Sequence, residues 1–174
     1  MRFGFPLTAG LLLLSGAHGA DAKLEPNYTS PAGVKIFNPG NFFDATGPWS
    51  IMSQAGDTLY IAGMRGIYPS NSTLAPVGMP RVRQAFQNMA ALAAMAGADI
   101  TSCSRVVVYV TDMYRYRPMC NEVQIELWGD DPNKYPPRTI IEVDRLNEDD
   151  IVEVEGTFWL GGTGKGEHSC YSSS

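Results

Sequence analysis

Two stretches near the C-terminal end of the chain have the pattern of β-strands, residues 138–143 and residues 151–155. In the second stretch valines alternate with glutamates, which is the period of two of a half-exposed strand. The polar segment 145–150 between them predicts a short turn, so we expect the two strands to form a hairpin. Two prolines directly before Arg138 keep the chain extended and exclude a helix, so Arg138 should begin the first of these strands.

Two helices are predicted in the middle of the chain. Residues 80–98 carry apolar side chains at the three- and four-residue spacing of one helical face, and Gly97 lies where such a helix would end. That apolar face consists of Val82, Phe86, Met89, Ala93 and Ala96. Residues 113–128 follow Asp112, a good capping residue, and Pro118 should make the first turns of this second helix irregular.

Further strands precede and separate these helices. A short strand is expected at 34–37, strands 51–54 and 58–63 should pair through a tight turn at Gly56, and the valine-rich segment 105–111 is typical of a buried strand. Apart from the short first strand, the order is strand-strand-helix-strand-helix-strand-strand, with hairpins at both ends. This order predicts an α+β fold, a mixed sheet with two helices on one face.

Helices on one face would leave the opposite face of the sheet bare. Residues such as Ile61, Val107 and Ile141 should line that face. A chain of 174 residues is expected to form one domain, so we expect the bare face to be buried against other subunits.

The chain is acidic, with a formal net charge of −5. The sequence has no basic patch, and phosphate contacts supply most of the non-specific affinity for nucleic acid, so nucleic acid is not an expected partner. The three cysteines are Cys103, Cys120 and Cys170, and their spacing matches no metal site. Cys103 and Cys120 either form one bridge or are two small buried apolar residues.

The N-terminal residues 1–19 have the pattern of a secretory signal peptide. A positive charge at Arg2 precedes an apolar run over 3–14, and small residues follow at 17–20. The alternatives are an apolar helix of the domain or an uncleaved anchor, but the run is too short to span a bilayer comfortably. We therefore expect secretion, and no later stretch is apolar enough to cross a membrane.

Two glycosylation sequons agree with export, one at Asn27 and one at Asn71. After the signal, residues 20–46 are rich in proline and glycine and predict an N-terminal arm. Residues 47–161 should form the folded domain. Residues 162–174, which are rich in glycine and serine, predict a disordered tail.

Arg138 and Glu153 are the candidates for chemistry on the two C-terminal strands. An arginine is always charged and offers a planar fork of donors, which suits a carboxylate. The alternative is an ordinary exposed arginine and a half-exposed strand, since surface ion pairs are common and weak. Spacing alone does not decide between these interpretations.

Several motifs, in order along residues 36–160, resemble the RidA/YjgF/UK114 family of reactive-intermediate deaminases. The motifs are Phe37-Asn38-Pro39, Gly47-Pro48-Trp49-Ser50, Tyr60-Ile61-Ala62-Gly63, Gln84-Ala85-Phe86-Gln87-Asn88, Val108-Tyr109-Val110-Thr111-Asp112, Cys120-Asn121-Glu122, Pro137-Arg138-Thr139 and Val152-Glu153-Val154-Glu155. The resemblance implies a chorismate-mutase-like fold of the bacillary type. It also implies a homotrimer whose sheets form a central barrel, with sites in the clefts between subunits. The implied activity is the hydrolysis of 2-enamine or 2-imino acids to 2-oxo acids and ammonia, without a cofactor or metal.

Residue by residue, the resemblance implies that Arg138 holds the substrate carboxylate and that Glu153 orients or activates water. It also implies that Asn121, Gly63 and the backbone of Ile140 contact the substrate.

Two positions depart from the family pattern. Trp49 replaces the usual tyrosine, and Ile140 replaces a frequent cysteine. An indole keeps an aromatic wall but loses the acceptor of a phenol. The departures and the signal keep two alternatives open: an enzyme of a secondary-metabolite pathway that hydrolyses, isomerises or cyclises a larger imine, and a non-catalytic trimer that binds small molecules.

Overall fold

A computed structural model describes residues 24–161, so the predicted signal peptide 1–19 and tail 162–174 lie outside the described residues. The strands are β1 (Tyr28–Thr29), β2 (Lys35–Phe37), β3 (Met52–Ala55), β4 (Thr58–Arg65), β5 (Cys103–Val110), β6 (Arg138–Glu142) and β7 (Val152–Trp159). The helices are α1 (Met79–Met95) and α2 (Met113–Trp128), with short 3-10 turns η1 (Ile100–Ser102), η2 (Pro132–Lys134) and η3 (Asn147–Asp149).

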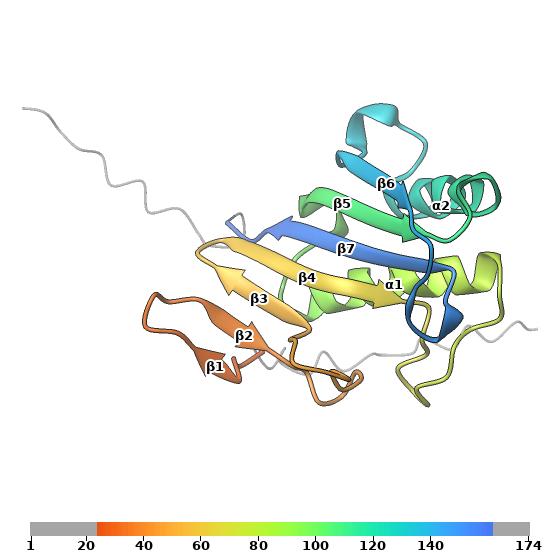
Figure 1. Ribbon diagram of the computed structural model, residues 1–174. Coiled ribbons are helices and arrows are strands. Elements are labelled where there is room, and N and C mark those ends of the chain that lie inside the picture. Colours follow the sequence, from red (N-terminus) through yellow and green to blue (C-terminus); the bar gives the residue numbers. More distant parts are fainter. Residues whose placement is uncertain (1–23, 162–174) are drawn as a thin grey trace, which may run out of the picture.

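Within the described residues the strands form one sheet in the order β1-β2-β3-β4-β7-β5-β6. All neighbouring pairs are antiparallel except β5 and β6, which are parallel. Both helices lie behind the sheet in the view of Figure 1. The predicted mixed sheet with two helices on one face is therefore confirmed. The N-terminal arm contributes the predicted strand at 34–37 as β2, and the unpredicted β1 extends the sheet beyond it.

The predicted C-terminal hairpin is wrong, because β5 lies between β6 and β7. Arg138 pairs with Val106 on one side of β5, and Val152 pairs with Val110 on the other. A parallel β5–β6 pair needs a long crossover, which α2 supplies. The short and largely exposed β6 then lies at the sheet edge. Strand β7 takes a central position, and four of its residues are buried on the core side: Val152, Val154, Gly156 and Phe158.

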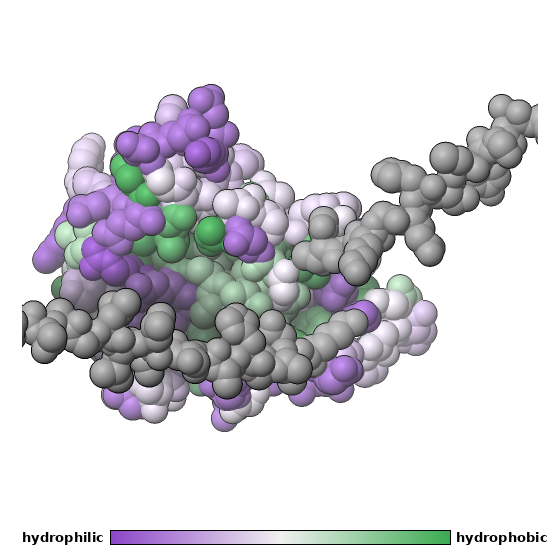
Figure 2. Space-filling model, turned by 180° about the vertical axis from the view of Figure 1, so that it is seen from behind, coloured by the Kyte–Doolittle hydropathy of each residue, from purple (hydrophilic) through white to green (hydrophobic). Residues whose placement is uncertain are grey.

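The core fills the space between α1, α2 and the sheet. The largest fully buried side chains include Phe86, Phe158, Leu59 and Met89. Gly156 makes the contact between β7 and α1 close, since a Cβ there would lie 2.7 Å from Met89 Sδ. Figure 2 shows the molecule from the helix side. Hydrophilic residues, in purple, lie at the periphery of this face, and moderately hydrophobic residues, in pale green, lie near its centre.

Local signals predicted both helices well. α2 begins after Asp112, whose side chain accepts a hydrogen bond from the Arg115 backbone N–H at 2.9 Å. Pro118 lies inside α2. α1 ends at Met95, slightly before the predicted end, and Gly97 follows it with a φ of 84°.

The open face of the sheet is more polar than predicted. Ile61 does not belong to it, because Ile61 is 3% exposed and packs in the core on the helix side. Val107 and Ile141 do lie on the open face, at 7% and 43% exposure. Ile61 shares the buried face of β4 with Leu59, two residues earlier, and the bulge between Ile61 and Met64 changes the alternation only after this point.

Cys103 and Cys120 are both buried and both free, so the bridge between them is not formed. Burial raises the pKa of each thiol to about 11. Both residues therefore act as small apolar core residues. None of the helices in the part of the chain that the structure describes has the length and apolar character to cross a membrane.

Candidate active site

Arg138 lies at the start of β6, where two uncharged amides of α2 hold its guanidinium. Its Nη1 donates to Gln124 Oε1 at 2.8 Å, and its Nη2 donates to Asn121 Oδ1 at 2.7 Å. The carbonyl of Pro137 accepts from Val106 N at 3.0 Å, which fixes the strand just before the arginine. The fork is therefore oriented without being neutralised.

The surroundings of Arg138 favour binding of an anion. Burial lowers its pKa, and the positive charge of Arg117 lowers that pKa further. The neighbouring Cys120 thiol, with its pKa raised to about 11, is neutral at physiological pH. Ile140, two residues further along β6, is half-buried and packs against the core rather than offering a polar group.

Glu153 lies on β7 directly over Gly63 of β4. A Cβ on Gly63 would overlap Glu153 Oε1 and lie 2.6 Å from its carboxyl carbon, so only glycine leaves room for this carboxyl group. Burial raises the pKa of Glu153; the positive charge of Arg65 opposes this, and the charges of Glu155 and Asp150 add to it. A carboxyl group with a raised pKa is suited to proton transfer near neutral pH.

A pocket of about 590 Å³ opens beside Glu153. Its wall includes the indole of Trp49 and the largely buried Arg65, whose Nη1 donates to Asn147 O at 2.7 Å and to Glu148 Oε2 at 3.0 Å. The loop at Glu148 and Asp149 is left-handed, with φ of 57° and 54°. The principal lining side chains are Phe43, Asp44, Trp49, Arg65, Glu148 and Glu153.

The structure thus places the six predicted site residues in two groups. Arg138, Asn121 and Ile140 lie together at α2 and β6, and Trp49, Gly63 and Glu153 lie together beside β4 and β7.

Within one chain the two groups do not meet. Arg138 pairs with Val106, whose side chain faces the helices, whereas Glu153 pairs with Tyr109 on the open face. The two residues are also three positions apart along the strands and two strands apart across the sheet, roughly 10 Å in each direction. Within one chain, therefore, the two groups do not line a common pocket.

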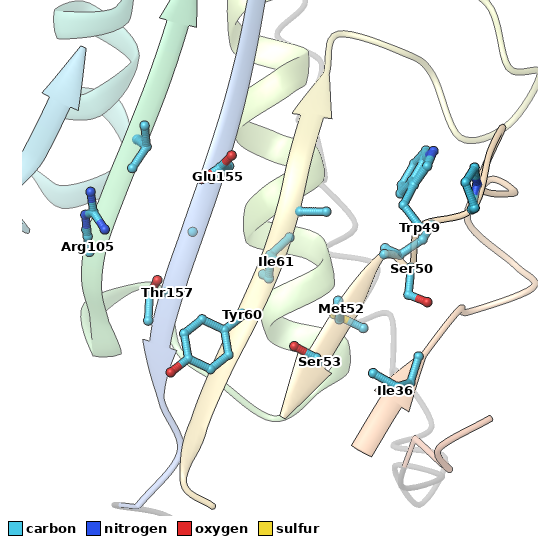
Figure 3. Close-up of a pocket in the computed structure, with 15 residues that line it drawn as sticks. Ile36, Trp49, Ser50, Met52, Ser53, Tyr60, Ile61, Arg105, Glu155 and Thr157 are labelled. Atoms are coloured by element: carbon cyan, nitrogen blue, oxygen red, sulfur yellow. The ribbon is translucent and has the colours of Figure 1, made fainter. Parts of the chain in front are cut away.

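A second pocket, of about 500 Å³, lies on the open face of the sheet. Figure 3 shows Arg105, Glu155 and Thr157 on β5 and β7, with Trp49 near the start of β3. The Tyr109 hydroxyl donates to Glu155 Oε1 at 3.2 Å across these strands. Trp49 lines both pockets, so this second pocket and the Glu153 pocket adjoin at Trp49.

Sequence reasoning missed two residues of these groups. Gln124 shares the Arg138 guanidinium with Asn121, and its position three residues after Asn121 on a predicted helix is a signal that helical periodicity contains. Arg65 follows the bulge in β4, so strand alternation could not have assigned its direction. The described residues contain no group of three or more histidine, cysteine or acidic side chains that could hold a metal ion.

The chain is similar to known proteins in sequence and in fold. The profile of the endoribonuclease L-PSP family matches residues 40–158. The 2-iminobutanoate/2-iminopropanoate deaminase of Mus musculus is 30% identical over 112 residues, which cover 64% of this chain and 80% of that protein.

Two solved structures have the same fold. The probable translation initiation inhibitor of Rhodopseudomonas palustris is 40% identical with a TM-score of 0.69, covering 74% of this chain and 98% of that one. RidA from an Antarctic Psychrobacter is 27% identical with a TM-score of 0.63, covering 69% and 94%. The chain therefore belongs to the endoribonuclease L-PSP (RidA/YjgF) family, as its sequence motifs predict.

Proposed function

We propose that the protein hydrolyses 2-imino acids, and the 2-enamine acids that tautomerise to them, to 2-oxo acids and ammonia. The observation that carries this proposal is the Glu153 carboxyl group, which lies over Gly63 in a pocket where burial raises its pKa. The mouse relative with this kind of activity in its name supports the same assignment. The net charge of −5 gives no support to RNA as the substrate.

In the proposed mechanism Arg138 holds the substrate carboxylate and Glu153 moves one proton. The oxygen of a water molecule bonds to C2 of the protonated imine while a water proton passes to Glu153. Glu153 returns this proton to the nitrogen, and the C–N bond then breaks as the hydroxyl oxygen forms the carbonyl. The departing ammonia takes the hydroxyl proton and leaves as ammonium. Since an imine carbon is already electrophilic, positioning supplies most of the required rate.

The site is complete in this proposal only between two chains of a homotrimer. The Arg138 group of one chain faces the Glu153 group of the next, which agrees with their location on opposite faces of the sheet. The charge of Arg138 has only amide partners among the described residues. It therefore remains free for a carboxylate.

Mixing two inactive variants tests this proposal. Arg138→Ala and Glu153→Gln should each abolish the release of 2-oxo acid from imines that an amino-acid oxidase generates, assayed in competition with semicarbazide. After joint refolding at equal amounts, about one interchain site in four should combine an intact Arg138 with an intact Glu153, so activity should return. Activity in neither the wild type nor the mixture would overturn the proposed reaction. An active wild type with an inactive mixed trimer would overturn the interchain site.

We also propose that the protein is exported through residues 1–19 and glycosylated at Asn27 and Asn71. Both asparagines are exposed, which supports this proposal. Expression in a secreting eukaryotic host should yield extracellular protein whose electrophoretic mobility increases after glycosidase treatment. Asn27→Gln and Asn71→Gln should each remove one step of this shift. Protein retained inside the cells with residues 1–19 intact would contradict the proposal.

A further inference from the structure

Three polar residues of α2 form one stripe along the helix. Arg117, Asn121 and Gln124 are separated by four and three positions, which places them within roughly 60° of one another around the helix axis. Asn121 and Gln124 both accept hydrogen bonds from Arg138. Arg117 therefore lies on the side of α2 that faces β6, one turn before Asn121, and its charge acts on Arg138.

The acidic residues of α2 lie on the other side of the helix. Glu126 forms two hydrogen bonds with Arg83 of α1, at 2.6 and 2.8 Å, and the charge of Glu122 also acts on Arg83. Near the start of α2, Glu142 accepts from Met113 N at 2.7 Å. Among the described residues, neither Arg117 nor Arg138 forms an ion pair.

Two neighbouring guanidinium groups without a carboxylate repel each other until an anion binds. One substrate carboxylate on Arg138 leaves the charge of Arg117 uncompensated. Arg117 is exposed and has a long flexible side chain, so it can reach a second group on the same ligand. A ligand with two carboxylates would neutralise both arginines.

We infer that Arg117 binds a second carboxylate and that the substrates are dicarboxylic 2-imino acids, the imines of acidic amino acids. This inference rests on the proposed deaminase function and adds the substrate class to it. Arg138 takes the carboxylate next to the imine carbon, and Arg117 takes the one at the far end of the side chain. The products are dicarboxylic 2-oxo acids and ammonia, from the same reaction with water.

The test compares imines made by oxidases from glutamate and aspartate with those made from leucine and methionine. For the dicarboxylic imines, Arg117→Gln should lower kcat/KM about 10- to 100-fold, the range expected for a lost hydrogen bond to a charged group. For the monocarboxylic imines it should lower kcat/KM far less, because Arg117 acts on their single carboxylate only through its charge and not by direct contact. Arg115→Gln is the matched control, since Arg115 lies on the opposite side of α2 over the ring of Tyr116 and should change neither.

Titration calorimetry with 2-oxoglutarate and 2-oxobutanoate provides a second readout that needs no turnover. The wild type should bind 2-oxoglutarate more tightly, and Arg117→Gln should remove this preference while weakening the binding of 2-oxobutanoate far less. If imines of both classes are hydrolysed equally and Arg117→Gln has no effect, the inference is wrong while the deaminase function stands. If no imine is hydrolysed, the proposed deaminase function is wrong. In that case, equal affinities of the wild type for 2-oxoglutarate and 2-oxobutanoate would also show that Arg117 does not bind a second carboxylate.

Discussion

The carboxyl group of Glu153 has a different pKa in the folded chain from that of an ordinary glutamate. Burial is the largest cause and raises the pKa. The positive charge of Arg65 lowers the pKa, and the negative charges of Glu155 and Asp150 raise it further. A raised folded pKa means that the folded state binds this proton more tightly than the unfolded state. The protonated Glu153 carboxyl group therefore stabilises the fold fully below the unfolded pKa of glutamate, and this stabilisation is lost as the pH rises through the folded pKa. Once ionised, Glu153 destabilises the fold.

Glu153→Gln should separate activity from stability. Loss of the proton-transfer group should reduce the deaminase rate about 10²- to 10⁴-fold. The same change should raise Tm at pH 7 to 8, because no buried carboxylate remains to be ionised. Calorimetric scans from pH 4 to 8 check the second effect, and the gap in Tm between variant and wild type should close toward acid pH. An unchanged Tm gap across this range would contradict the raised pKa.

The pH profile of the wild type should show the same group. Activity should fall as the pH decreases through the pKa of Glu153, at a higher pH than an ordinary glutamate would give. In Glu155→Gln, which removes a different carboxyl group of β7, this acidic limb should keep its shape and shift only slightly to lower pH. If activity instead falls at the pH expected from the pKa of an ordinary glutamate, this result would count against Glu153 as the base.

Gly63 is expected to tolerate no side chain. Gly63→Ala should displace the Glu153 carboxyl group and lower kcat, since its Cβ would overlap Oε1. Gly40→Ala is the matched control, because a Cβ at Gly40 meets no atom within 4 Å. Steady-state kinetics of both variants check this, and a fully active Gly63→Ala would show that Glu153 does not need this position.

At the scale of elements, the signals that succeeded were local ones. The apolar period of α1 and the capping residue Asp112 depend on neighbours within one or two turns, and both helices were predicted from them. Strand partners depend on the whole chain, so alternation in β7 correctly gave its faces but not its neighbours. The hairpin prediction failed for this reason.

The sequence predicted individual candidate-site residues but not their arrangement in space. Family motifs predicted roles for Arg138, Asn121 and Glu153, and the structure shows the surroundings of each without testing those roles. The separation of Arg138 from Glu153 could not be predicted, since it follows from the insertion of β5 between β6 and β7. The direction of the Arg65 side chain could not be predicted either, because the bulge in β4 reverses the alternation of faces before Arg65.

A buried ion pair joins α1 to the segment before β7. Arg81 Nη1 lies 2.9 Å from Asp150 Oδ1, with side-chain exposures of 8% and 0%, and Arg81 Nε donates to the carbonyl of Ala75. Asp150 Oδ1 also accepts from Ile151 N at 2.7 Å, while Asp150 Oδ2 has no hydrogen-bond partner among residues 24–161. The pair therefore connects the loop before α1 with the loop that carries Glu148 at the rim of the Glu153 pocket.

Asp150→Ala should destabilise the protein by about 3–5 kcal/mol, because it leaves the Arg81 charge buried without a partner. Arg145→Ala breaks the neighbouring exposed pair with Asp149 and should cost less than about 1 kcal/mol. Urea unfolding followed by circular dichroism measures both. Equal effects of the two variants would show that Arg81 gains solvent or another acceptor when Asp150 is absent.

At the scale of the whole molecule, the open face carries large side chains that a single chain leaves uncovered. Tyr60, Ile141 and Trp159 are 48%, 43% and 53% exposed. Together with the two half-sites, this face is where the proposed homotrimer would bury surface.

Ile141→Lys should therefore convert the trimer to monomers, since it would bury an unpaired charge at the interface. Activity should fall with the trimer content, because neither half-site is sufficient alone. Val77→Lys is the control: Val77 is 58% exposed in the loop before α1 and should leave assembly unchanged. Light scattering coupled to size-exclusion chromatography measures the mass. A trimeric Ile141→Lys variant would place the interface elsewhere.

Cys103 and Cys120 are buried in the core, so their reaction with a thiol reagent reports unfolding events that expose the core. In a Cys170→Ser background, a maleimide dye at pH 7 should leave the native protein colourless and mark only molecules that have exposed these thiols. The labelling rate under mild conditions then reports how often the interior becomes accessible, and no foreign probe has to be engineered into the chain.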